Sequence, residues 1–76
     1  MKSSVDKRSV LIAGRETSVS LEKQFWDCLR EIADERGQSF RQLIANIDAE
    51  RKQGNLSSAI RLFVLRDYQH RAGKRT

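Results

Sequence analysis

Along residues 17–21, apolar side chains alternate with Thr and Ser, a period of two that is typical of a strand with one buried face. Upstream, residues 10–13 are apolar at every position, which indicates a strand that needs cover on both faces. Gly14 lies between these stretches and favours either a turn or a bulge. We therefore predict that residues 8–21 form the β part of the chain.

From this point the apolar period changes to three or four residues, which predicts helices. The first helix is expected over residues 21–36, with Ser20 as its N-cap. Gly37 would end it, since glycine adopts the left-handed conformation at little steric cost. The second helix is expected to begin at Ser39, which forms a capping-box pattern with Gln42.

A third helix is expected over residues 56–70, after Gly54 ends the second helix and Asn55 caps the next. One apolar stripe consists of Leu56, Ile60, Val64 and Tyr68. Further apolar residues surround this stripe, as in a helix buried on more than one side. In so short a chain, the extra surface must meet the apolar strand or another subunit. The residues expected in third-helix packing or an oligomer interface are Leu56, Ile60, Leu62, Phe63, Val64 and Leu65.

Strand edges leave backbone N–H and C=O groups unpaired, so a chain with so little β structure needs a further partner strand. We expect a second copy to supply it across a two-fold axis, with the helices of both copies wrapped beneath. The expected fold is mainly α with a short β-ribbon, in an intertwined homodimer with inter-subunit antiparallel strands. The expected dimer core consists of Val19, Leu21, Phe25, Trp26, Leu29, Ile32, Phe40, Leu43, Ile44 and Ile47.

The 76 residues suffice for one small domain. Its core is barely large enough to keep the chain folded without a disulfide, a metal ion or oligomerisation. Cys28 is the only cysteine and His70 the only histidine, so we expect no internal disulfide, no closed metal site and no cofactor. A reducing cytoplasm is the expected compartment. No apolar run approaches the length of a membrane span or a signal peptide.

The net charge of +5 is unevenly distributed, since both ends are basic and the first helix is acidic. Basic ends suit phosphate contacts, because a polyanion releases counterions when it binds them. The same residues would also simply keep the chain soluble, and composition favours these two interpretations equally. The expected organisation is a disordered basic arm (1–7), a core (8–53), an additional C-terminal helix (54–71) and a flexible basic tail (72–76).

Catalytic patterns are lacking along the chain. There is no Gly-rich phosphate-binding loop, no carboxylate pair with a plausible pocket and no set of residues in the sequence order of a catalytic triad. Trp26 is expected in the core, Cys28 is expected to pack as a small hydrophobe, and His70 belongs to a solvated basic segment. We therefore do not expect an enzyme.

This order of elements resembles the ribbon-helix-helix proteins of the Arc/MetJ superfamily, which are small bacterial repressors and antitoxins. The resemblance covers residues 16–51. It is carried by Thr17-Ser18-Val19-Ser20-Leu21, by Glu35-Arg36-Gly37-Gln38-Ser39-Phe40 and by Leu43-Ile44. Residues 54–61 and 8–10 are similar to a subgroup with an appended third helix, which extends the resemblance to nearly the whole chain.

The resemblance implies that outward side chains of the paired strands touch base edges and that the second helix directs N–H groups at a phosphate. With the apolar positions inward, the base-facing residues are Glu16, Ser18 and Ser20. Family members usually carry Arg, Lys, Gln or Asn there, and this chain departs from that pattern. The residues expected at phosphate, or in a basic arm, are Lys7, Arg8, Arg15, Ser39, Phe40 and Arg41.

The expected function is that of a DNA-binding transcriptional regulator, a repressor or autoregulator, acting on double-stranded DNA as a homodimer or a dimer of dimers. The alternative is a protein-interaction module, such as an antitoxin or adaptor. That module would use the same dimer fold and bind a partner protein through the third helix or the tail.

Overall fold

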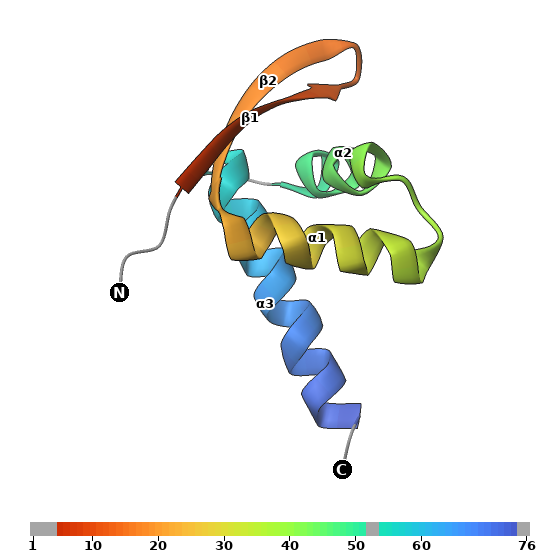
Figure 1. Cartoon of the computed structure of the whole chain (residues 1–76). Coiled ribbons are helices and arrows are strands. Elements are labelled where there is room, and N and C mark those ends of the chain that lie inside the picture. Colours follow the sequence, from red (N-terminus) through yellow and green to blue (C-terminus); the bar gives the residue numbers. More distant parts are fainter. Residues whose placement is uncertain (1–4, 52–53, 75–76) are drawn as a thin grey trace.

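The computed structural model describes residues 5–51 and 54–74 (Figure 1). The elements are β1 (Val5–Ile12), β2 (Arg15–Glu22), α1 (Lys23–Arg36), α2 (Phe40–Glu50) and α3 (Leu56–Lys74). A two-stranded antiparallel ribbon is thus followed by three helices, which confirms the predicted fold, mainly α with a short β-ribbon. No helix in the described part of the chain is long and apolar enough to cross a membrane.

A tight hairpin joins the two strands. They pair in register from Val5 opposite Glu22 to Ile12 opposite Arg15, which leaves only Ala13 and Gly14 as the connection. Both turn residues have positive φ, 51° at Ala13 and 80° at Gly14. This backbone twist matches the twist of the flanking strands, so the two-residue loop closes without splaying the ribbon.

The first strand of the same chain pairs with one edge of β2, and the pairing with a strand of a second copy stays a prediction. Residues 5–7 of the predicted disordered arm belong to β1, and residues 1–4 lie outside the described residues. Polar contacts account for the difference. The Trp26 indole N–H donates to the carbonyl oxygen of Asp6 at 3.1 Å, and the Arg8 guanidinium lies 4.9 Å from the centroid of the Trp26 ring.

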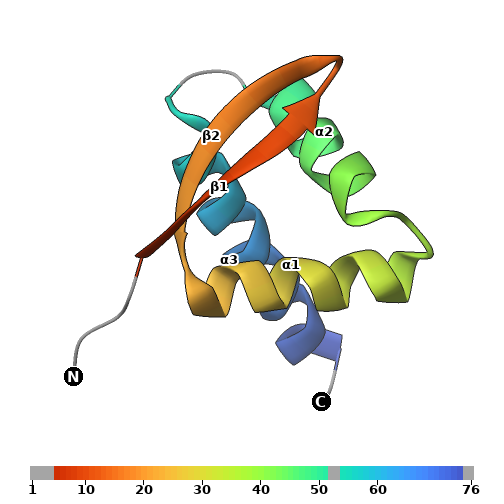
Figure 2. The ribbon, with the colours of Figure 1, turned by 45° about the horizontal axis from the view of Figure 1, so that its top comes forward.

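One face of the ribbon lies across the helices, where β1 contacts α2 and β2 contacts both α1 and α3 (Figure 2). The core between them consists of Ile12, Val19, Leu21, Trp26, Leu29, Ile32, Ala33, Leu43, Ile44, Ile47, Leu56, Ile60 and Val64. Of the residues predicted for a dimer core, all are buried within this one chain except Phe25 and Phe40, which are half-buried. These residues thus pack together within one protomer, and their role in a dimer core stays a prediction.

The helix ends follow the predicted caps with two exceptions. Gly54 does not end α2, because that helix ends at Glu50 and has Arg51 as its C-cap. Gly37 ends α1 at φ 68°, the Ser39 hydroxyl accepts from the N–H of Gln42 at 3.0 Å, and the Asn55 side chain accepts from the N–H of Ser58 at 2.8 Å. The predicted N-cap Ser20 is wrong, because β2 continues to Glu22 and α1 begins at Lys23.

The third helix is longer than predicted and exposes part of its apolar surface. It extends to Lys74, so residues 72–74 of the predicted tail are helical, whereas residues 75–76 lie outside the described residues. Leu56, Ile60 and Val64 are buried, but Tyr68 of the same predicted stripe is 44% exposed. The core ends before Tyr68 because the helix projects beyond the ribbon and α2 (Figure 1).

Candidate nucleic-acid interface

The outward face of the ribbon carries the residues predicted to face bases. Val19 and Leu21 are almost completely buried, so the period of two turns Glu16, Ser18 and Ser20 away from the core. Glu16 and Ser18 are exposed, and Ser20 is half-buried. The structure therefore brings these three side chains together on one face.

The first strand adds to this face Ser9, which the sequence did not indicate, and Lys7, which the sequence predicted at phosphate or in a basic arm. Ser9 pairs with Ser18 and Lys7 pairs with Ser20 across the ribbon, and side chains of paired residues share a face. A cluster of hydroxyl groups, with Lys7 beside it, thus forms the outward surface. Alternation alone could not reveal the first half of β1, because its inward residues Asp6 and Arg8 are polar.

The outer end of the ribbon face is defined by Leu11, which pairs with Glu16 and is 46% exposed. We call this surface the ribbon face. It consists of Lys7, Ser9, Leu11, Glu16, Ser18 and Ser20.

Two of the predicted phosphate-contacting arginines lie elsewhere. Arg8 belongs to the inward face, where it stacks over Trp26 and pairs with Asp6 at 3.4 Å. Arg15 opposes Ile12 at the start of β2 and lines a recess that also contains Asp48. Of the basic residues predicted in the strands or the arm, only Lys7 reaches the ribbon face.

The N-terminus of α2 presents free donors beside the ribbon. The Ser39 hydroxyl is engaged by Gln42, and the first-turn N–H groups of Phe40 and Arg41 have no intrahelical acceptor. The Phe40 ring packs against Trp26, with ring centroids 5.8 Å apart, so only its backbone is free for a ligand. The Arg41 side chain is exposed.

A groove of about 490 Å³ connects this helix end to the hairpin. It is lined by Leu11, Ala13, Gly14, Ser39, Arg41, Gln42 and Ala45. Leu11 belongs to the ribbon face and Arg41 to the predicted phosphate seat. The two predicted contact regions are therefore one continuous surface.

An ion pair fixes the other end of the ribbon to α3. The Arg61 Nε donates to a carboxylate oxygen of Glu22 at 3.0 Å, and this hydrogen bond lowers the pKa of the Glu22 carboxyl below its usual range. Among the described residues, no three His, Cys, Asp or Glu side chains cluster as a metal site would require.

Comparisons with known proteins place this arrangement in a family. A family model described as a ribbon-helix-helix domain matches residues 5–68. The chain is also similar to the solved structure of an uncharacterized protein from Bordetella pertussis Tohama I, with 36% sequence identity and a TM-score of 0.79. The match covers 96% of this chain and 62% of that chain, and no curated protein matches significantly. The chain belongs to the ribbon-helix-helix family.

Proposed function

We propose that this protein is a double-stranded DNA-binding transcriptional regulator, a repressor or autoregulator, that inserts its ribbon face into the major groove. The observation that carries the proposal is the continuity of the ribbon face with the N-terminus of α2 through the groove at Leu11 and Arg41. A major groove admits a two-stranded ribbon, and the adjoining phosphates then lie beside the ribbon. Membership of the ribbon-helix-helix family supports the same role.

The chemistry of the ribbon face suits modest base discrimination. Serine hydroxyls donate and accept, so Ser9, Ser18 and Ser20 fit several base edges equally well. Lys7 donates to guanine or to phosphate, and Glu16 accepts from a cytosine amine. We infer that sequence preference comes from the combination of these contacts and from DNA shape rather than from one bidentate pair.

Phosphate contacts would fix the register of the ribbon on the duplex. The free N–H groups of Phe40 and Arg41 sit at the positive end of the α2 dipole, which favours an anion. The exposed Arg41 guanidinium adds a charge-assisted contact beside them.

We propose further that the regulator acts as a homodimer or a dimer of dimers, as the family resemblance implies. Within the described residues, the ribbon has two strands, and each leaves one edge without a backbone partner. Two ribbon faces related by a two-fold axis would read two half-sites and would double the number of phosphate contacts.

Fluorescence anisotropy tests the proposed function. The purified protein is titrated with its own upstream duplex and with a scrambled duplex of equal length, each at low and at high salt. Tighter binding to the upstream duplex that persists at high salt supports a specific regulator. Equal and salt-sensitive binding to both duplexes, or no binding, contradicts it.

The same assay tests whether Arg41 contacts a phosphate or a base. We expect Arg41→Ala to weaken binding to both duplexes by a similar factor and to reduce the salt dependence, because a phosphate contact carries no sequence information. A loss confined to the upstream duplex would instead place Arg41 on a base.

A further inference from the structure

One apolar side chain is exposed among the polar residues of the ribbon face. Leu11 is 46% exposed, whereas Ile12 after it is buried and Val10 before it packs partly buried against the core. Alternation along the strand therefore directs Leu11 toward solvent. A single exposed leucine is ordinary on a protein surface, so its surroundings decide whether it has a role.

Leu11 lies beside an exposed carboxylate. Its cross-strand neighbour is Glu16, and side chains of paired residues share a face. Among the described residues, Glu16 takes part in no ion pair. At the other end of the ribbon, Val5 is also exposed opposite a glutamate, but Arg61 binds that residue, Glu22. Of these two pairs, the Leu11–Glu16 pair is thus the one whose carboxylate is available to a ligand.

This pair adjoins the proposed phosphate seat. The groove of about 490 Å³ that contains Ser39 and Arg41 is also lined by Leu11, the one ribbon-face residue in its lining. A duplex that contacts Arg41 through a phosphate would therefore place a nearby base edge against Leu11. Phosphate contacts of this kind fix the register in which side chains meet the bases.

We propose that Leu11 packs against the 5-methyl group of a pyrimidine in the major groove, while Glu16 accepts from the amine of a cytosine in the adjoining base pair. The inference rests on the proposed function and names the bases that the ribbon face prefers. The 5-methyl group is the apolar group that base edges present in the major groove, and an exposed leucine matches it. Thymine carries this group, and so does 5-methylcytosine.

The spacing of the two side chains suits neighbouring base pairs. Cβ atoms of paired residues in an antiparallel ribbon are about 4.5–5.5 Å apart. Successive base pairs are stacked about 3.4 Å apart. Leu11 and Glu16 therefore reach adjacent bases, which predicts a methyl-bearing pyrimidine next to a cytosine in the binding site.

Fluorescence anisotropy with modified upstream duplexes tests the methyl contact. Uracil in place of every thymine removes the methyl groups and keeps the hydrogen-bonding groups, whereas 5-methylcytosine in place of every cytosine adds methyl groups. If thymine supplies the contact, the wild type should bind the uracil duplex about fourfold more weakly for each methyl group, the effect of exposing one such apolar group to water. If 5-methylcytosine supplies it, the methylated duplex should bind about fourfold more tightly. Leu11→Ser should show neither difference.

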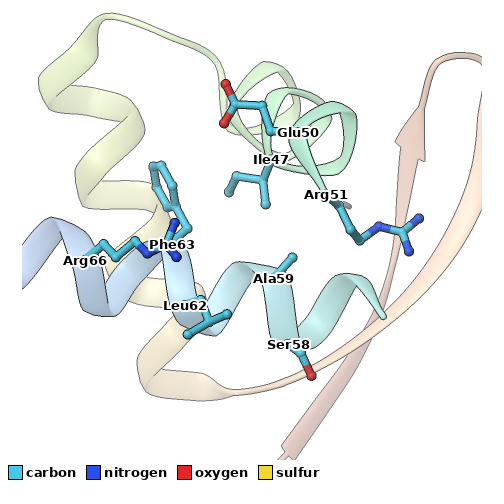
Figure 3. A pocket seen from close by; sticks show the side chains of 8 residues that line it. All are labelled: Ile47, Glu50, Arg51, Ser58, Ala59, Leu62, Phe63 and Arg66. Atoms are coloured by element: carbon cyan, nitrogen blue, oxygen red, sulfur yellow. The ribbon is translucent and has the colours of Figure 1, made fainter. Parts of the chain in front are cut away.

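Leu62→Ser is the matched control, because it makes the same substitution at a leucine of similar exposure. Leu62 is 52% exposed and lines the groove of about 390 Å³ between α2 and α3, which no ribbon-face residue lines (Figure 3). This variant should retain the wild-type differences between the duplexes. Circular dichroism checks that both variants are folded.

The outcomes separate this inference from the proposed function. Equal binding of the wild type to all three duplexes overturns the methyl contact, and so does a difference that Leu11→Ser retains. If the wild type then still prefers the upstream duplex to the scrambled one, the proposed function stands without this contact. If it does not, the proposed function fails together with the inference.

Single substitutions of the same kind locate the base. We expect the loss of affinity to be confined to one position in each half-site, next to a cytosine. Replacing that adjoining C·G pair should weaken the wild type but not Glu16→Ala, because the variant has no acceptor for the cytosine amine. A loss spread evenly over all thymines contradicts a contact by one side chain.

Discussion

At the scale of single residues, the turn of the ribbon contains an alanine in the left-handed region. Ala13 has φ 51°, and its Cβ makes that conformation costly. Asn tolerates it, and Asn-Gly is the preferred pair for such a hairpin turn. We expect Ala13→Asn to raise the free energy of unfolding by about 1 kcal/mol, measured by urea denaturation.

The neighbouring glycine provides the control for this prediction. A Cβ added at Gly14 would meet nothing within 4 Å, so a side chain there would cause no clash. It would be unfavourable only because Gly14 has a positive φ of 80°. Gly14→Ala should therefore lower the free energy of unfolding. If Ala13→Asn leaves stability unchanged or lowers it, the strain assigned to Ala13 is absent.

The ion pair between Glu22 and Arg61 makes the free energy of unfolding depend on pH. The hydrogen bond from Arg61 lowers the pKa of Glu22 below its ordinary value of 4.5, so the folded state prefers the carboxylate. The resulting stabilisation is present above that pH and is lost as the pH falls through the lowered pKa. The stability difference between wild type and Glu22→Gln should therefore shrink from neutral to strongly acidic conditions, by chemical denaturation at each pH. A constant difference would show that the pair contributes no pH dependence.

At the scale of elements, patterns of apolar residues and caps predict helices well. Ser39, Asn55 and Gly37 act on their own helix ends, so local sequence determines them. The β part was predicted to begin at residue 8, whereas β1 begins at Val5, because the contacts that anchor its first residues are not local. The contacts that hold Asp6 and Arg8 come from Trp26, which lies far along the chain. The start of α1 was misplaced for a related reason, since pairing with β1 keeps residues 21 and 22 in the strand.

The two faces of α3 should respond differently to truncation. Ile60 is completely buried against the ribbon and helices, so Ile60→Ala should cost roughly 2–5 kcal/mol of unfolding free energy. Leu62 is exposed, and Leu62→Ala should cost less than about 0.5 kcal/mol of unfolding free energy. Urea denaturation at low protein concentration measures both values. Equal losses would contradict the assignment of Ile60 to the core and of Leu62 to the exposed side of α3.

At the scale of the whole molecule, the sequence predicts the ribbon-helix-helix fold and the outward direction of Ser18 and Ser20, whereas the intertwined dimer stays a prediction. One edge of β2 pairs with β1 and the other has no backbone partner among the described residues, so a strand from a second copy stays a prediction. Ser9 and Lys7 became visible at the site only once β1 was placed beside β2.

The central claim is that the ribbon face, and not basic charge in general, binds DNA. Two substitutions of equal charge separate these possibilities in the anisotropy assay with the upstream duplex. Ser18→Glu puts a carboxylate in the middle of the ribbon face, and Ala72→Glu puts one at the exposed far end of α3 (Figure 1). We predict that Ser18→Glu removes the preference for the upstream duplex, while Ala72→Glu retains it. Equal weakening by both substitutions would contradict the account, since only net charge would then matter.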